Sequence, residues 1–264
     1  MRIARFVATA EPLYGIVEGE PDAPTGELTV TELHGDPFFQ GIQPTSTTHR
    51  LEDVRLVAPI IPRSKVVGVG RNWAGHAAEL GNAVPDRVQF FLKPNTSVVG
   101  PGEPVTLPSW SERVSYEAEL AVVIGTICKD VPVDRVDDVV FGYTVANDLT
   151  ARDAQQSDLQ WARAKGFDGA CPLGPWIETG LTSSQTEDLR ITMDLDGQTV
   201  QDGTTADMVF GVRDIVAAVS EAFTLLPGDV ILTGTPAGVG TVEAGQRTEA
   251  TIEGIGTLAT FYRR

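Results

Sequence analysis

The chain is poor in cysteine and in positive charge. Its two cysteines, Cys128 and Cys171, lie far apart and make neither a disulfide framework nor a CxxC pair, so we expect a reducing, cytoplasmic location. There are 20 basic residues against 36 acidic ones, which gives a net charge of −16. Such a surface repels a phosphate backbone or an anionic membrane, so we expect neither nucleic acid nor a membrane as a partner.

Long apolar runs are also missing. No stretch approaches the ~20 apolar residues of a membrane span, and the N-terminus has no apolar leader segment. We therefore expect a soluble, unprocessed protein. With 264 residues, 42% of them hydrophobic, the chain is long enough to bury a sizeable core in one large domain, or in a main domain with a small extra one.

The 27 glycines and 17 prolines fall between short β-branched runs, which predicts a strand-dominated α+β protein. Residues 1–60 are expected to form a small N-terminal domain, with strands at 2–8, 14–18 and 27–32 and an extended connector at 58–62. Residues 61–264 form the main domain. Its expected strands lie at 65–70, 88–93, 113–125, 141–146, 229–233 and 247–262, with a hairpin at 190–201 and helices at 73–80, 149–158 and 214–223.

Three carboxylates stand at or near strand ends. Apolar residues alternate along 113–125, so Glu117 and Glu119 share one face of that strand, and Asp148 follows the next long strand. Carboxylates without nearby histidine or thiol suit a hard ion such as Mg²⁺, Mn²⁺ or Ca²⁺. The spacing alone is equally compatible with a solvated strand face.

A histidine and a few cations accompany these carboxylates. His76 and Glu79 are three positions apart on a predicted helix, where they form either an exposed pair or a general base oriented by a carboxylate. The four cations that border these segments, in an otherwise acidic chain, are favourably placed to form a positive pocket for a small anionic substrate. They are Arg71, Lys93, Arg152 and Lys165.

Several common motifs are excluded. Gly68 and Gly70 follow a predicted strand, but the next glycine is Gly75, too late for a dinucleotide-binding GxGxxG. There is no GxSxG, HExxH or Walker motif, so serine hydrolase, zincin and NTPase functions have no support. Cys171, followed by Pro172, is interpreted as a packed thiol.

Six motifs in a fixed order resemble the fumarylacetoacetate hydrolase superfamily, from residue 65 to the C-terminus. They are VGVGRNW (67–73), FLKP (91–94), YEAEL (116–120), NDLTARD (147–153), AKGFD (164–168) and PGDVILTGTP (227–236). The resemblance implies a mixed β-sheet roll at 61–264 built around Mg²⁺ or Mn²⁺, with Ca²⁺ as a substitute in crystals, behind a small N-terminal domain at 1–60. It also implies a homodimer.

The resemblance assigns roles to matching positions. It implies Glu117, Glu119 and Asp148 as metal ligands and His76, Glu79 and Lys165 as catalytic residues. The substrate-binding residues that it implies are Arg71, Asn72, Lys93, Arg152, Gln155 and Thr235. Trp73 stands where the family commonly has tyrosine, and Gly75 where a polar residue often precedes the histidine, which bears on the substrate rather than on the chemistry.

The expected activity is hydrolytic cleavage of a C–C bond in a 2,4-dioxo acid, such as an acylpyruvate, fumarylpyruvate or a fumarylacetoacetate-like compound, through a metal-stabilised enolate. The same enolate chemistry also suits a decarboxylase of an oxaloacetate-like 2-oxo acid, or an isomerase of the 2-hydroxyhepta-2,4-diene-1,7-dioate type. A more distant alternative is a scaffold of the same fold without catalysis.

Overall fold

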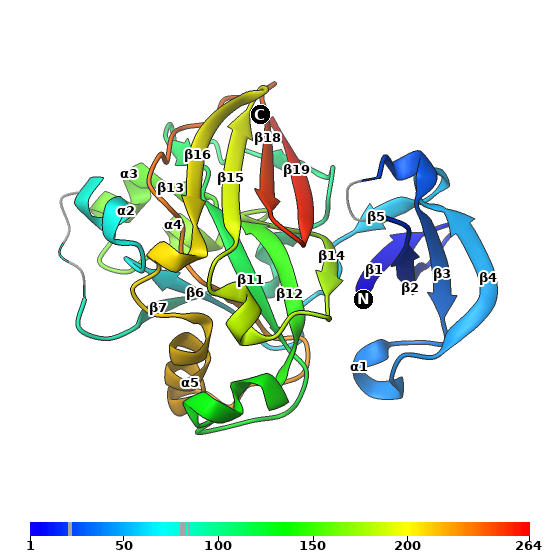
Figure 1. Cartoon of the computed structure of the whole chain (residues 1–264). Helices are drawn as coiled ribbons and strands as arrows, with labels where there is room; N and C mark the ends of the chain where they lie inside the picture. Colours follow the sequence, from blue (N-terminus) through cyan, green and yellow to red (C-terminus); the bar gives the residue numbers. More distant parts are fainter. Residues whose placement is uncertain (21–22, 80–82, 84) are drawn as a thin grey trace.

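The computed structural model describes residues 1–20, 23–79, 83 and 85–264, and for residues 76–78 only the backbone. In this part of the chain strands dominate, as predicted, and the sheets are mixed. Figure 1 shows a larger body at the left and a smaller lobe, made from the first strands, at the right. No helix within the described residues has the length and apolar character needed to cross a membrane.

One large sheet runs through both parts, because β1 of the lobe pairs with β14 of the body. The order along this sheet is β4 (Pro44–Arg50), β3 (Thr29–Leu33), β2 (Pro12–Glu18), β1 (Arg2–Val7), β14 (Cys171–Glu178), β12 (Val140–Asn147), β11 (Ala118–Ile124), β17 (Val230–Leu232), β6 (Val66–Gly70) and β7 (Gln89–Lys93). Two further strands pair at its side, β5 (Arg55–Val57) with β1 and β8 (Val98–Val99) with β14.

A second sheet packs on the body strands of the first. Its order is β16 (Gln198–Thr204), β15 (Arg190–Leu195), β18 (Arg247–Ile252), β19 (Gly256–Arg263) and β9 (Pro104–Thr106). The contacts run from β11 and β12 to β15, β18 and β19. The central strand β11 is buried along its whole length, so its alternate residues face two different cores.

Short elements complete the chain. A small ladder joins β10 (Val114–Ser115) to β13 (Thr150–Ala151). The helices are α1 (Pro37–Gln40), α2 (Ala74–Glu79), α3 (Arg152–Ser157), α4 (Ala162–Gly166) and α5 (Val212–Ala222). Single 3-10 turns lie at Thr25–Glu27, Leu51–Asp53, Asn95–Ser97, Val133–Asp138, Ser183–Thr186 and Thr205–Asp207.

Three of the expected elements differ clearly in their bounds. The single strand predicted at 247–262 is two antiparallel strands, β18 and β19, because residues 253–255 form a turn in which Gly254 has a φ of 72°. The single strand predicted at 113–125 is split into β10 and β11, because Tyr116 and Glu117 leave the ladder to bond to Gly240 and to the side chain of Asn147. The helix predicted at 149–158 begins only at Arg152, since Thr150 and Ala151 pair with β10. The last two differences concern the ends of elements near the carboxylates.

Candidate active site

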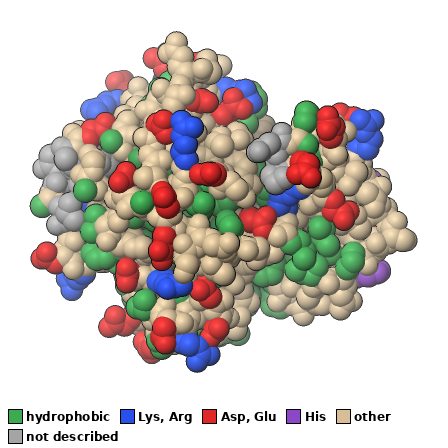
Figure 2. Space-filling model, in the orientation of Figure 1, with side chains coloured by type: hydrophobic (Ala, Val, Ile, Leu, Met, Phe, Trp, Pro, Cys, Tyr) green, Lys and Arg blue, Asp and Glu red, His purple; other side chains and the backbone are tan. Residues whose placement is uncertain are grey.

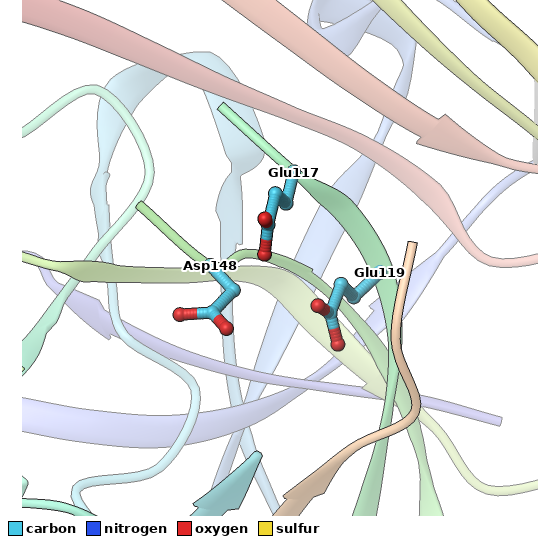
Figure 3. A group of neighbouring side chains, drawn as sticks. All are labelled: Glu117, Glu119 and Asp148. Carbon is cyan, nitrogen blue, oxygen red and sulfur yellow. The ribbon is translucent and has the colours of Figure 1, made fainter. Parts of the chain in front are cut away.

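The three predicted carboxylates converge. Glu117, Glu119 and Asp148 each offer an oxygen atom, and these atoms lie within 4.8 Å of one another. All three residues are buried, at 3%, 1% and 1% exposure. Figure 3 shows the side chains of Glu117 and Glu119 meeting that of Asp148 from the neighbouring segment. The explanation as a solvated strand face therefore does not hold.

The backbone around the triad explains this convergence. The N–H of Glu117 donates to Asn147 Oδ1 at 3.0 Å, and the N–H of Asp148 donates to the carbonyl of Glu117 at 2.9 Å. The end of β12 is thereby tied to the gap between β10 and β11. The amide of Gly234, just after β17, donates to Glu119 Oε2 at 2.7 Å and fixes the third carboxylate.

Buried cations compensate the negative charge. Lys165 Nζ donates to Glu117 Oε2 and Asp148 Oδ2, both at 2.6 Å, while Arg152 Nη2 lies 2.5 Å from Glu117 Oε1. Lys93 Nζ, completely buried, lies 2.5 Å from Asp148 Oδ1 and 2.9 Å from the carbonyl of Ala170. Three buried carboxylates need such partners, because an uncompensated buried charge is strongly destabilising.

The surroundings of Glu119 and Lys165 raise the pKa of both side chains. Burial, Asp148 and Glu117 together raise the pKa of Glu119 well above its ordinary value. For Lys165, burial acts to lower the pKa, but the carboxylates of Asp148 and Glu117 outweigh burial and raise it. Lys165 therefore stays an ammonium at neutral pH.

A cavity of about 490 Å³ opens onto two of these carboxylates. It is bounded by the end of β6, by β7, β10, β11, α3 and α4, and by the segment after β17. Its lining includes nine of the predicted site residues. These are Arg71, Asn72, Glu79, Glu117, Glu119, Arg152, Gln155, Lys165 and Thr235.

The predicted substrate-binding residues differ in what their side chains already contact. The Asn72 amide is fully used, since it donates to the carbonyls of Phe210 and Thr233 and accepts from the N–H of Phe210. Arg71, next to it, is half-buried and has a left-handed backbone, with φ of 59°. Such a conformation is uncommon outside glycine and is held here by the anchored Asn72.

Thr235 Oγ1 donates to the carbonyl of Ala118 at 2.8 Å, and Gln155 Oε1 accepts from Arg152 Nη1 at 2.9 Å. Lys93 lies behind Asp148, outside the cavity lining, and so contacts a carboxylate of the triad rather than the open space. We had expected it at the substrate.

The predicted dyad is described only in part. Glu79, at the end of α2, lines the cavity, and its two carboxylate oxygens accept the Gly238 amide at 3.2 and 3.3 Å. The side chain of His76, on the same helix, lies outside the described residues.

Sequence reasoning missed several contributors. Gln201, from the second sheet, accepts the N–H of Ala118 and donates to Thr235 Oγ1 and the carbonyl of Pro236. Arg113, Ser115 and Trp161 line the cavity. Arg113 and Ser115 carried a usable signal, because they lie on the same alternating face as Glu117.

The donor set fits a hard divalent cation. Three buried carboxylates that converge within 4.8 Å provide oxygen ligands of the kind that Mg²⁺ and Mn²⁺ prefer, and among the described side chains no histidine or cysteine belongs to this group. The cavity beside them leaves room for a ligand to approach the same position. The site is therefore able to hold a metal together with a small acid.

Comparisons with known proteins agree with the fold. Residues 65–261 match the family model described as fumarylacetoacetate (FAA) hydrolase, C-terminal, and residues 1–59 match the one described as Rv2993c-like, N-terminal. Protein Rv2993c of Mycobacterium tuberculosis is 47% identical over 260 residues, covering 98% of this chain and 96% of that protein.

Solved structures give the same result. The crystal structure of 2-hydroxyhepta-2,4-diene-1,7-dioate isomerase from Mycobacterium marinum has a TM-score of 0.91 at 44% identity, covering 100% of this chain and 98% of that one. Fumarylacetoacetate hydrolase from Exiguobacterium antarcticum has a TM-score of 0.84 at 31% identity, covering 100% and 99%. The chain thus belongs to the fumarylacetoacetate hydrolase family, whose members are enzymes.

Proposed function

We propose that this protein is a divalent-metal-dependent hydrolase that cleaves a C–C bond in a 2,4-dioxo acid. The observation that carries the proposal is the convergence of Glu117, Glu119 and Asp148 beside a cavity that also contains Lys165 and Arg152. A scaffold without catalysis has no need for three buried carboxylates at the end of an open cavity. Burial of this kind is costly and is typical of functional sites.

The proposed ligands of Mg²⁺ or Mn²⁺ are Glu117, Glu119 and Asp148. A cation held by these residues would supply Lewis-acid charge that stabilises an enolate of the substrate. Lys165 and Arg152 add fixed positive charge beside that position, and both are already oriented by their bonds to Glu117. Thr235 and Gln155 are proposed to contact the substrate from the cavity wall.

Hydrolysis also requires a base that activates water. We propose His76 for this role, with Glu79 as the carboxylate that orients its imidazole. Glu79 lines the cavity, and the Gly238 amide holds it in place, which supports this assignment. Water adds to the 4-carbonyl, the C3–C4 bond breaks, and its electron pair passes to the 2-oxo fragment as an enolate, which is then protonated.

An isomerase is the second candidate, because a structural relative with a TM-score of 0.91 is described as 2-hydroxyhepta-2,4-diene-1,7-dioate isomerase. Isomerisation uses the same enolate but consumes no water. Decarboxylation of an oxaloacetate-like acid also needs mainly an electron sink. The requirement for a water-activating base therefore separates hydrolysis from both alternatives.

The test is product analysis with Mn²⁺ on an acylpyruvate, fumarylpyruvate, oxaloacetate and an unsaturated 2-oxo heptanedioate, for the wild type and His76→Ala. We expect cleavage of a dioxo acid by the wild type. The His76→Ala variant should lose about 10²–10⁴-fold in hydrolysis and less in any decarboxylation.

Glu117→Gln serves as the metal control and should lose all Mn²⁺-dependent turnover, whereas Glu112→Gln, an exposed glutamate in the same segment, should keep it. If the wild type only isomerises or decarboxylates, the hydrolase proposal fails. If Glu117→Gln keeps its activity, the metal assignment fails.

We also propose a division of the chain near residue 60, into a small N-terminal domain and a catalytic domain. It is supported by the family matches, of which one ends at residue 59 and the other begins at residue 65. Residues 58–65 between them belong to no helix or strand, in keeping with a connector.

A further inference from the structure

Four alternate residues of one segment line the cavity. Arg113, Ser115, Glu117 and Glu119 all border it, while the intervening Val114, Tyr116 and Ala118 belong to the hydrophobic core. This is the alternation expected of extended chain. It persists across the gap between β10 and β11, so the four side chains form a row along one wall of the cavity, here called the 113–119 row.

Burial along the 113–119 row gives the cavity a direction. Glu119 and Glu117 are 1% and 3% exposed, Ser115 is 4% exposed, and Arg113 is exposed. The carboxylates therefore lie at the closed end and Arg113 at the mouth. The four steps of extended chain from Arg113 to Glu117 span about 13 Å, which is enough for an acid of about six or seven carbons and part of an arginine side chain.

The backbone of Arg113 is held in place, whereas its guanidinium makes no ion pair within the part of the chain that the structure describes. Its carbonyl accepts the N–H of Arg152 at 2.7 Å. Asp153 holds the two residues before it, since its carboxylate accepts Ser111 Oγ at 2.7 Å and the N–H of Glu112 at 2.9 Å. Among the described residues no carboxylate pairs with the Arg113 side chain. By contrast, Arg152 is already bonded to Glu117.

Arg71 is the other cavity arginine without an ion pair among the described residues. It lies at the closed end of the cavity, opposite to Arg113. Its neighbour Asn72 bonds to the carbonyl of Thr233, and the amide of the next residue, Gly234, bonds to Glu119. Arg71 is thereby placed near the triad, where the 2-oxo acid group is proposed to bind. Arg113 is the cation left for the far end of a ligand.

We propose that Arg113 binds a second carboxylate at the distal end of the substrate, and so makes the enzyme selective for dicarboxylic 2-oxo acids. This inference rests on the proposed binding of the 2-oxo acid group at the triad. An arginine pairs with a carboxylate through two parallel hydrogen bonds, and its fixed backbone reduces the entropy lost on binding. A methyl or amide end leaves the guanidinium without a partner.

The test compares matched acids in two assays. Turnover is measured as kcat/KM for 2,4-dioxoheptanedioate and for 2,4-dioxoheptanoate, which lacks the distal carboxylate. Binding is measured by calorimetry on the Mn²⁺-loaded protein with 2-oxohexanedioate and 2-oxohexanoate. The variants are Arg113→Gln, Arg113→Lys and the control Arg5→Gln, which removes the same charge from β1, far from the cavity.

We expect the wild type and Arg5→Gln to favour the diacid about 10- to 100-fold in both assays, as for other hydrogen bonds to a charged group. Arg113→Gln should lose this preference because kcat/KM and affinity fall for the diacid and stay unchanged for the monoacid. Arg113→Lys should keep part of the preference. The inference is overturned if the wild type shows no preference, or if Arg113→Gln weakens both acids equally. If neither dioxo acid is cleaved, the proposed hydrolase fails, while the binding assay still decides the role of Arg113.

Discussion

Glu119 differs from the other two carboxylates of the triad in its partners. Glu117 and Asp148 each contact buried cations, whereas Glu119 accepts the Gly234 amide and has no ion pair among the described residues. Its pKa is raised by burial and by the two neighbouring carboxylates. Within the triad it is the group best placed to hold a proton when no metal is bound.

This difference predicts a pH dependence of metal binding. A carboxyl group whose folded pKa lies above its unfolded value of about 4.5 stabilises the fold less and less as pH rises from that value to the folded pKa. A metal must displace the proton, so Mn²⁺ affinity should rise with pH over the same window. We expect the increase in Tm caused by Mn²⁺ to grow as pH rises above about 4.5, measured by thermal unfolding.

The matched variants are Glu119→Gln and Glu112→Gln. The first should lose the Mn²⁺-induced increase in Tm together with its pH dependence, and the second should keep both. An increase that is the same at every pH in the wild type would contradict the assignment of Glu119 as the proton-holding ligand.

At the scale of elements, the short helix α3 connects two parts of the site. It carries Arg152 and Gln155 into the cavity, and its Asp153 holds Ser111 and Glu112. Burial by itself raises the pKa of Asp153, but hydrogen bonds from Ser111, Glu112 and Ala154 outweigh it and lower the pKa below 3.8. The stabilisation from the ionised Asp153 carboxylate, which holds Ser111 and Glu112, is therefore present above about pH 4 and is lost as pH falls through the lowered pKa.

Asp153→Asn should loosen this anchor, because an amide accepts through one oxygen where the carboxylate uses two. We expect faster hydrogen exchange at residues 111–113 and a loss of about 1 kcal/mol in unfolding free energy. Asp158→Asn is the control, since Asp158 pairs with the exposed Arg163. Unchanged exchange at 111–113 in Asp153→Asn would show that the loop is held by other contacts.

The sequence predicted most of the body strands but not how they are interrupted. The two-residue period along 113–125 placed Glu117 and Glu119 on one face correctly. The gap at Tyr116 and Glu117 was not predictable, because it depends on Asn147 and Gly240, which are distant in sequence. The roles implied for His76 and the substrate-binding residues stay predictions.

β14 was missed for a different reason. Its sequence, CPLGPWIE, contains two prolines and a glycine, which are typical of loops. In the structure it lies between β1 and β12, and Pro175 falls where the pairing register with β12 shifts, so the missing N–H does not interrupt a ladder pair. Only the neighbouring strands reveal that such a segment can be central.

On the scale of the whole molecule, charge is distributed unevenly. Acidic side chains outnumber basic ones on the face shown in Figure 2, as expected for a net charge of −16. The cavity, however, is lined by four basic side chains against three acidic ones, Arg71, Arg113, Arg152 and Lys165 against Glu79, Glu117 and Glu119. An anionic substrate is thus attracted by the cavity itself and not by the surface around it.

The two lobes share a core residue. Trp176 on β14 packs with Phe6, Val17 and Leu28 of the small lobe, and Arg2 lies over its ring. Its indole N–H donates to the carbonyl of Ile255 in the body at 2.7 Å. The lobe is therefore attached through apolar contacts as well as through the β1–β14 ladder, which should make both lobes unfold together.

Trp176→Ala should cost about 3–5 kcal/mol, since it removes a large buried side chain, and should lower Tm by about 10 °C. Trp110→Ala is the control, because Trp110 is 44% exposed, and it should change Tm by much less. Calorimetry decides between a single shifted transition and two separate ones. A Tm unchanged by Trp176→Ala would mean that the lobe is held by the strand pairing alone.

The 113–119 row has an evolutionary consequence. Arg113 is exposed at the open end of the cavity, so its replacement disturbs neither the core nor the carboxylates. Such a substitution should change the free energy of unfolding little, which makes it an accessible step when substrate preference changes during evolution. A one-residue insertion or deletion within the row is different, because it would turn the glutamates beyond it into the core. With Arg113 as the proposed contact for the distal carboxylate, we therefore expect substrate preference to change by substitution at this position and not by a change in the length of the segment.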